Sequence, residues 1–142
     1  MSGFLLDTNV VSEFARPKPD ERVVDWTAGT DESLVFLSVL SLGEIRKGIE
    51  RLQAGRRRSQ LELWLELDLR SRFRDRILPI DEEIADRWGT ITALAAAQGR
   101  PVPVVDGLLA ATAIQHNLTL VTRNGSDFAG TGVPTLNPWI DT

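Results

Sequence analysis

The chain has 142 residues, a formal net charge of −4, one histidine, and neither cysteine nor tyrosine. This length suits a single folded domain, and the 42% hydrophobic and 25% charged residues are ordinary for a globular protein. The composition excludes a disulfide framework, a thiolate nucleophile, a cysteine-ligated zinc site and a pair of catalytic imidazoles. Carboxylates are the plentiful reactive groups that remain, so an enzyme of this composition is expected to use carboxylates and a hard cation.

The beginning of the chain has no features of a targeting segment. The apolar run 4–6 ends at Asp7, which is far too short for the core of a signal peptide. No stretch approaches the roughly 20 apolar residues that a membrane helix needs. We therefore expect a cytoplasmic protein that has no contact with a membrane.

Short apolar runs alternate with helical patterns along the chain. Strands are expected at 3–6, 34–37, 77–80 and 118–122, with a possible edge strand at 135–136. Helices are expected at 8–16, 20–26, 38–52, 59–73, 81–98 and 105–116, and Asp20, Ser38 and Asp81 are their candidate N-caps. This alternation favours an α/β fold with a mostly parallel sheet of four to five strands between layers of helices.

Segment 59–73 is open to two interpretations. Its leucines alternate as in a strand, but Leu and Glu are helix formers and the segment has no β-branched residue, so we predict a helix. A helix with leucines on several sides leaves apolar surface for another chain. We expect Trp64 to pack in the core, whereas core and partner contacts are equally open for Leu63 and Leu67.

Basic residues are concentrated in the middle of the chain. Residues 46–76 contain ten basic and five acidic side chains, while the remainder of the chain is acidic. Arginine suits the bidentate geometry of phosphate, so this stretch is a candidate phosphate-facing surface. The alternative is a set of solvated helix faces on which the arginines pair with Glu62, Glu66 and Asp68, and charge counting alone favours it.

Four acidic residues lie at or just past the end of a candidate strand: Asp7, Glu44, Asp106 and Asp127. Each has an ordinary explanation, as a helix cap, a capping-box partner of Ser41, a first-turn acid or a turn residue. A parallel sheet would bring all four to one edge, where crowded carboxylates raise one another's pKa unless a cation neutralises them. Mg²⁺ or Mn²⁺ fits such a site and supports phosphodiester hydrolysis.

Four segments in this order resemble a PIN-domain ribonuclease: FLLDTNVVSE, SVLSLGEIRKGIERL, VVDGLLAATAIQHNLTLVTRN and the DF that follows. The set is similar to the VapC toxins of toxin–antitoxin pairs, and the closing GVPTLNPW resembles their FitB-type branch. The resemblance spans essentially the whole chain. It implies one PIN domain over 1–142, folded as a three-layer sandwich, that acts as a Mg²⁺- or Mn²⁺-dependent endoribonuclease.

The resemblance also implies a division of labour among the acids. Asp7, Glu44 and Asp106 match the family's metal-binding and catalytic acids. Asp7 and Asp106 match the residues that hold the principal metal ion, and Glu44 matches the residue that holds or orients the attacking water. Thr8 and Asn9 follow Asp7 as they do in the family, so hydrogen bonds from them to Asp7 are expected.

The family's fourth acidic position falls at or near Asn124, where this chain has an amide. Two consequences are open: Asp127, three residues further on, supplies the missing carboxylate, or a second metal ion binds weakly. Thr122 and Asn124 are candidates for polarising a phosphate or a water ligand.

The implied partners are an RNA substrate, a small VapB-like antitoxin and a second copy of the chain, with a higher toxin–antitoxin assembly also open. The candidate RNA-facing residues are Arg46, Lys47, Arg51, Arg56, Arg57 and Arg58. A haloacid-dehalogenase-like phosphatase is disfavoured because it requires a second Asp where this chain has Asn9. The alternative that stays open is a catalytically degenerate PIN domain that binds RNA or protein without cleaving it.

Overall fold

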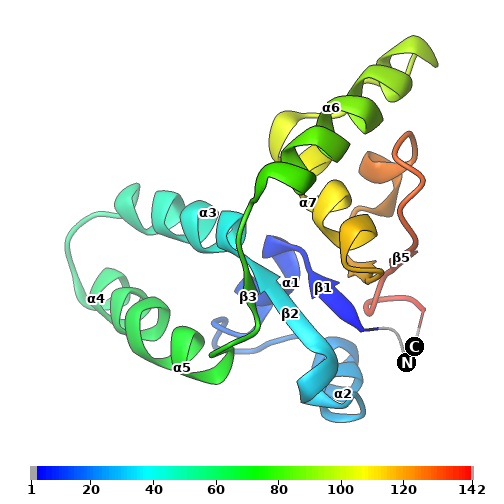
Figure 1. Cartoon of the computed structure of the whole chain (residues 1–142). Coiled ribbons are helices and arrows are strands. Elements are labelled where there is room, and N and C mark those ends of the chain that lie inside the picture. The colour runs from blue at the N-terminus through cyan, green and yellow to red at the C-terminus, as the bar shows by residue number, and fades with distance from the viewer. Residues whose placement is uncertain (1–2, 142) are drawn as a thin grey trace.

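A five-stranded parallel sheet lies between two layers of helices in the computed structural model, which describes residues 3–141 (Figure 1). The strand order is β3-β2-β1-β4-β5, and every neighbouring pair is parallel. The strands are β1 (Phe4–Leu6), β2 (Val35–Ser38), β3 (Ile77–Leu78), β4 (Thr119–Val121) and β5 (Thr135–Leu136). The predicted α/β class and the layered sheet are confirmed, and the edge strand at 135–136 completes it.

The helices follow the predicted order, with bounds that differ by a few residues. They are α1 (Thr8–Glu13), α2 (Glu21–Ala28), α3 (Val39–Glu50), α4 (Arg56–Leu63), α5 (Arg70–Arg72), α6 (Glu82–Ala97) and α7 (Val104–Gln115). Asp20, Ser38 and Asp81 each accept a hydrogen bond from a backbone N–H in the first turn that follows, which confirms them as N-caps. Two 3₁₀ turns, η1 (Glu32–Leu34) and η3 (Gly125–Phe128), were not predicted.

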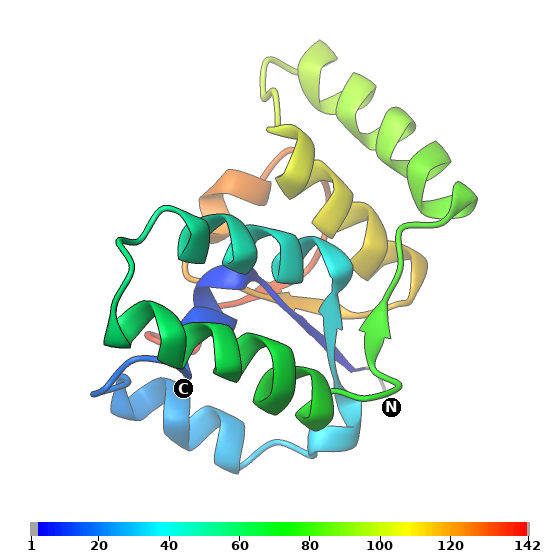
Figure 2. The same cartoon turned by 90° about the vertical axis from the view of Figure 1, so that its left-hand side faces the viewer.

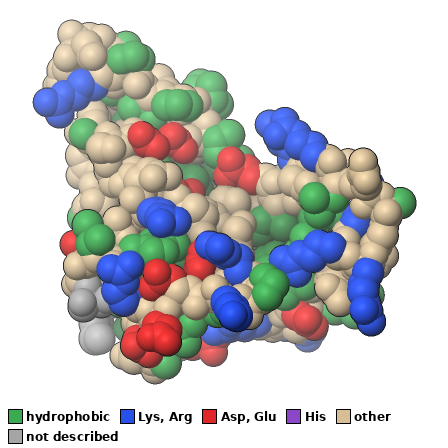
Figure 3. Space-filling model, turned by 180° about the vertical axis from the view of Figure 1, so that it is seen from behind, with side chains coloured by type: hydrophobic (Ala, Val, Ile, Leu, Met, Phe, Trp, Pro, Cys, Tyr) green, Lys and Arg blue, Asp and Glu red, His purple; other side chains and the backbone are tan. Residues whose placement is uncertain are grey.

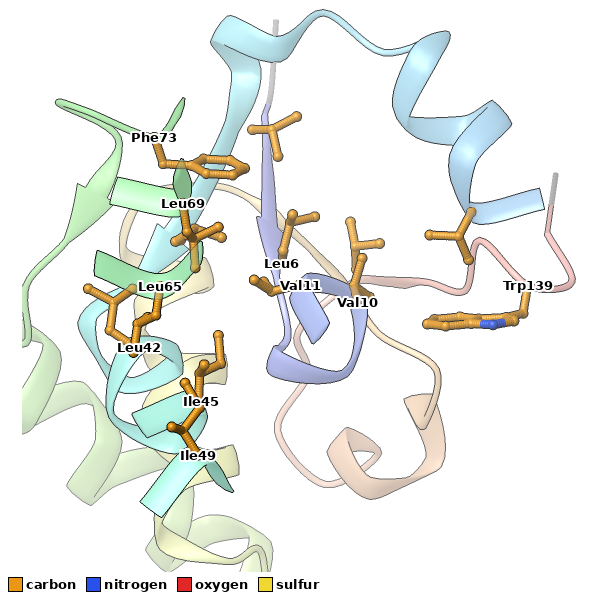
Figure 4. Close-up of a cluster of buried hydrophobic side chains, with 14 residues drawn as sticks. Leu6, Val10, Val11, Leu42, Ile45, Ile49, Leu65, Leu69, Phe73 and Trp139 are labelled. Atoms are coloured by element: carbon orange, nitrogen blue, oxygen red, sulfur yellow. The ribbon is translucent and has the colours of Figure 1, made fainter. Parts of the chain in front are cut away.

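Alternate residues of each strand supply the two hydrophobic layers. Leu6, Leu37 and Val121 face a cluster that α1, α3 and the helix over 56–72 cover. Leu5 and Leu120 face the opposite cluster, to which α7 contributes Leu109, Ala110 and Ala113. Figure 4 shows the first cluster, with Trp139 from the C-terminal segment beside Val10 at its edge. The period of two in the strands therefore places a helical layer on each face of the sheet.

Segment 59–73 is helical, as predicted, and one turn of it is a π-helix, η2 (Trp64–Leu69), between α4 and α5. Leu65, Leu69 and Phe73 are 0%, 2% and 1% exposed and point into the core (Figure 4). Trp64 packs against the same core, as expected, whereas Leu63 and Leu67 are each 59% exposed. The alternating leucines thus belong to two faces of a helix rather than to one face of a strand.

Helix α6 packs on α7 and extends away from the sheet (Figures 1 and 2). Gly99, with φ of +74°, ends α6 in the left-handed conformation that glycine adopts without strain. The turn over 99–103 then leads into α7. Among residues 3–141, no helix is both long enough and apolar enough to cross a membrane.

Candidate active site

Asp7 stands where the central strand β1 ends and α1 begins. Its backbone N–H donates to the carbonyl of Val121 on β4 over 2.9 Å, which continues the parallel pairing past the strand. Its buried carboxylate accepts hydrogen bonds from the Thr8 N–H at 2.7 Å and the Thr122 hydroxyl at 2.8 Å. Asp7 is therefore the helix cap that the sequence indicates, and the neighbouring strand also holds it in place.

Glu44 lies on α3 with its side chain exposed to solvent. Because Ser38 caps this helix, Glu44 is free of the capping box that Ser41 would otherwise form with it. The Thr8 hydroxyl donates to Glu44 Oε1 over 2.5 Å and lies 3.0 Å from the Ser41 hydroxyl. A hydroxyl has one proton, so Ser41 donates to Thr8 when Thr8 donates to Glu44. These hydrogen bonds connect Glu44 to Thr8, the residue that follows Asp7.

Asp106 is half-buried in the first turn of α7. The expectation that it follows a strand is wrong, because α7 begins at Val104 and the chain arrives from α6 through a turn. Helix α7 leads back to β4, so its N-terminal end lies at the carboxyl edge of the parallel sheet. The helix thereby places Asp106 at the same edge as Asp7. Asp127, on η3 after β4, reaches this edge as well.

The charges of the four carboxylates act on one another. Burial raises the pKa of Asp106 to about 6, and the charges of Asp7, Asp127 and Glu44 contribute to the rise. Burial also raises the pKa of Asp7, the hydrogen bonds from Thr122 and Thr8 oppose the shift, and the charges of Glu44 and Asp127 add to it. The structure thus brings together the four acids that the sequence singled out, with negative charge that favours a cation.

Over residues 3–141, no group of three or more Asp, Glu, His or Cys side chains forms a ready-made cage for a metal ion. Mg²⁺ does not need one, because it keeps several waters and usually binds one or two carboxylates together with substrate phosphates. The donors here are hard carboxylate oxygens, and the pKa values of Asp7 and Asp106 are raised by burial and, to a smaller extent, by the charges of neighbouring carboxylates. This donor set fits a hard divalent cation.

Three neighbouring polar residues, Thr122, Asn124 and Asn9, take different positions. Thr122 is fully buried, and its hydroxyl accepts from the Asn124 N–H at 3.1 Å while it donates to Asp7, so it faces the acid rather than a substrate. Asn124 is exposed. Asn9 does not bond to Asp7; its side chain accepts from the Arg123 N–H at 3.4 Å.

The loop after β4 has a second attachment that sequence reasoning missed. Asn137 donates from Nδ2 to the Arg123 carbonyl over 3.1 Å, and the Arg123 guanidinium lies 5.0 Å from the centroid of the Trp139 ring. The segment that carries Thr122 is thus held by Asn9 on one side and by residues 137–139 on the other. The only sequence signal for this attachment is the NPW run near the end of the chain.

Part of the basic stretch makes polar contacts within the chain. Arg46 pairs with Glu66 at 2.8 Å, Arg58 pairs with Glu62 at 3.0 Å and with Glu50, and Arg57 donates to the Ala15 carbonyl at 3.0 Å. Of the six candidate RNA-facing side chains, three make no hydrogen bond or ion pair within the part of the chain that the structure describes: Lys47, Arg51 and Arg56. Basic side chains are prominent on the lobe at the right of Figure 3, and acidic ones interrupt them elsewhere on this face.

A family model described as the PIN domain matches residues 4–133. The chain is 41% identical over 137 residues to Toxin FitB of Neisseria gonorrhoeae (strain ATCC 700825 / FA 1090), which covers 96% of this chain and 99% of that protein. It is 33% identical over 135 residues to VapC ribonuclease Y4jK of Sinorhizobium fredii (strain NBRC 101917 / NGR234), covering 95% of this chain and 96% of that protein.

Comparison with solved structures points to the same group of proteins. The crystal structure of FitAcB from Neisseria gonorrhoeae superposes with a TM-score of 0.91 at 40% sequence identity, covering 96% of this chain and 99% of the matched chain. The predicted PIN-like sandwich is therefore confirmed. The chain belongs to the PIN-domain family, in the group that contains Toxin FitB and the VapC ribonucleases.

Proposed function

We propose that this chain is a metal-dependent endoribonuclease that hydrolyses RNA phosphodiester bonds and that a cognate antitoxin holds inactive. The observation that carries the proposal is the group of four carboxylates at the carboxyl edge of the sheet. Two of them, Asp7 and Asp106, have raised pKa values, chiefly because they are buried and also because the charges of the other carboxylates act on them. The relative named VapC ribonuclease Y4jK supports RNA as the substrate. An RNA substrate places the proposed activity in the cytoplasm.

Asp7 and Asp106 are the proposed ligands of a Mg²⁺ or Mn²⁺ ion. Such an ion, when bound, lowers the pKa of a water ligand and stabilises the charge of a phosphodiester transition state. Thr8 and Thr122 hold Asp7 in one orientation through hydrogen bonds to its two oxygens. Glu44 is exposed and held by the Thr8 hydroxyl, so its carboxylate is available to orient the attacking water and accept its proton.

Asp127 is the proposed substitute for the family's fourth acid. Its charge raises the pKa of both Asp7 and Asp106, so it acts on the same site although Asn124 stands at the usual position. An amide oxygen at Asn124 is itself a possible hard ligand, but it brings no charge. A second ion is therefore expected to bind more weakly than the first.

A small antitoxin and a second copy of the chain are the proposed protein partners. The relative at 41% identity is named a toxin, and a cell that makes an RNA-cleaving toxin must hold it inactive. Leu63 and Leu67 are each 59% exposed and lie four residues apart on one helix face, so they form an apolar contact for either partner. The acidic site suits a basic side chain of an antitoxin.

The proposal is tested by incubating the purified, antitoxin-free chain with RNA in Mg²⁺, in Mn²⁺ and in chelator. We expect cleavage with either ion, none in chelator, and recovery when the ion is restored in excess. Binding of RNA without cleavage under all three conditions would show the alternative, a PIN domain that has kept its fold and lost its chemistry.

Thr122→Val is expected to lower the cleavage rate about 10- to 100-fold without unfolding the protein, as losses of groups that orient metal ligands usually do. The buried hydroxyl that fixes Asp7 is removed, while a side chain of similar shape fills the space. Thr122→Ser keeps the hydroxyl and is the matched control, expected to retain most of the activity. Equal rates for the valine and serine variants would show that this hydrogen bond does not matter for cleavage.

A further inference from the structure

A cleft of about 460 Å³ opens directly beside the candidate active site. One wall is the turn over 100–103 between α6 and α7, and the other is the segment over 126–130, which includes part of η3. Figure 2 shows this turn next to the orange segment that follows β4. Asp106 and Asp127 belong both to the cleft and to the acid cluster, so the two spaces are continuous.

The cleft also has a cationic side chain, Arg100. Its guanidinium makes no hydrogen bond or ion pair with any residue in the range 3–141. Its backbone is well held: the Arg100 N–H donates to the Ala95 carbonyl at 2.8 Å, directly after the left-handed Gly99. Arg100 thus has a fixed backbone and a cationic side chain that forms no ion pair with the carboxylates of the same cleft. A cation in this situation suggests that the cleft binds an anionic ligand.

The two walls of the cleft pack against each other at Gly130. A Cβ at this position would lie 3.0 Å from both the Cβ and the carbonyl oxygen of Arg100, and 3.1 Å from the Cβ of Ala95. Glycine thus allows the segment after η3 to pack directly on the turn that carries Arg100. The spacing of the walls follows from this contact and not from a flexible side chain.

We propose that this cleft binds the nucleotide next to the scissile phosphate and that Arg100 binds the phosphate of that nucleotide; the inference rests on the RNA cleavage proposed above. Asp106 lies at the junction, so a chain whose scissile phosphate sits at the acids continues into the cleft. Pro101, Val102 and Pro103 supply an apolar wall for a base, and Ser126 supplies a hydroxyl. The volume falls in the range of small-molecule clefts, which suits one unpaired nucleotide and not a duplex.

The test compares Arg100→Gln with Arg74→Gln in steady-state cleavage of a single-stranded RNA at several salt concentrations. Arg74 is not one of the six candidate RNA-facing residues. Its side chain is also exposed and unpaired among residues 3–141, and it precedes β3, so it lies at the amino edge of the sheet, opposite the acids. Both variants remove one positive charge. Melting temperatures of both variants check that the fold is unchanged.

Arg100→Gln is expected to lower kcat/KM about 10- to 100-fold, mainly through a higher KM, as loss of one hydrogen bond to a charged group predicts. The slope of log kcat/KM against log salt concentration should fall in magnitude by about 0.7, the value for one phosphate contact to a single strand. Arg100→Lys should restore the slope, because a lysine also neutralises one phosphate. Arg74→Gln should change neither quantity.

An Arg100→Gln variant with the KM and salt slope of the wild type overturns the inference while leaving the proposed nuclease function intact. A lower kcat with unchanged KM and slope also overturns it, since Arg100 would then act on the acids and not on the RNA. A wild-type chain that does not cleave RNA in Mg²⁺ or Mn²⁺ overturns the proposed function and the nucleotide site together.

Discussion

Asp7→Asn is expected to reduce RNA cleavage by at least about 10³-fold while the protein stays folded. Asparagine caps helices as well as aspartate does, so the start of α1 should be preserved. The substitution removes the negative charge that would bind the metal ion. A loss of several kcal/mol of transition-state stabilisation corresponds to a rate reduction of about 10³-fold. Cleavage under single-turnover conditions at saturating Mg²⁺, together with a thermal melt, measures both effects.

The matched control for this substitution is Asp31→Asn. Asp31 also caps a helical turn through its side chain, but it precedes η1 and β2 and therefore lies away from the acid cluster. This variant should cleave RNA at the wild-type rate. If Asp7→Asn also cleaved within about tenfold of wild type, Asp7 would not be a metal ligand.

Asp106→Asn is expected to abolish cleavage and, in the absence of metal, to make the protein more stable at neutral pH. The pKa of Asp106 is raised from 3.8 to about 6, chiefly by burial. A raised pKa in the folded state means that the charged form is less favourable there than in the unfolded chain. The wild type therefore loses stability as pH rises from about 4 to about 6, and asparagine, which does not ionise, avoids that loss.

The measurement is the melting temperature of both proteins in chelator at pH 4 and pH 7.5. We expect similar values at pH 4 and, at pH 7.5, a variant that melts roughly 2–4 °C higher, as a gain of about 1 kcal/mol produces in a chain of this size. Water screens part of the repulsion because Asp106 is only half-buried. Adding Mg²⁺ should raise the melting temperature of the wild type alone.

Asp31→Asn gives the opposite sign and so serves again as the control. Hydrogen bonds from the Ser33 side chain and backbone hold the pKa of Asp31 below its usual value, so its charged form stabilises the fold at neutral pH. This variant should melt at or slightly below the wild-type temperature at pH 7.5. A lower melting temperature for Asp106→Asn would contradict the interpretation that burial of the charged Asp106 carboxylate beside other acids destabilises the fold.

Sequence alone was sufficient for features that depend on neighbours along the chain. The apolar run that ends at Asp7 is a strand because alternate residues serve two hydrophobic layers, and Ser38 caps α3 because its hydroxyl reaches an N–H two residues on. The same local reasoning separated Glu44 from its apparent capping box. It also predicted that Trp64 packs in the core, which the structure confirms.

Features that depend on distant contacts could not be read in this way. Asp106 reaches the acid cluster through the packing of α7, not through a strand before it. The pairing of Arg46 with Glu66 joins residues 20 positions apart, so counting charges could not decide which basic side chains stay free. The π-helical turn at 64–69 has no distinct composition, because the same leucines would suit an uninterrupted α-helix.

The attachment of the β4 loop by residues 137–139 sets the order in which the candidate site can be assembled. Asp7, Glu44, Asp106 and Asp127 all leave the ribosome before the side chains of Asn137 and Trp139 that clamp Arg123 and its neighbours. During synthesis the four acids are therefore present before these contacts with Arg123 can form, so the loop after β4 gains this second attachment only once residues 137–139 have been made.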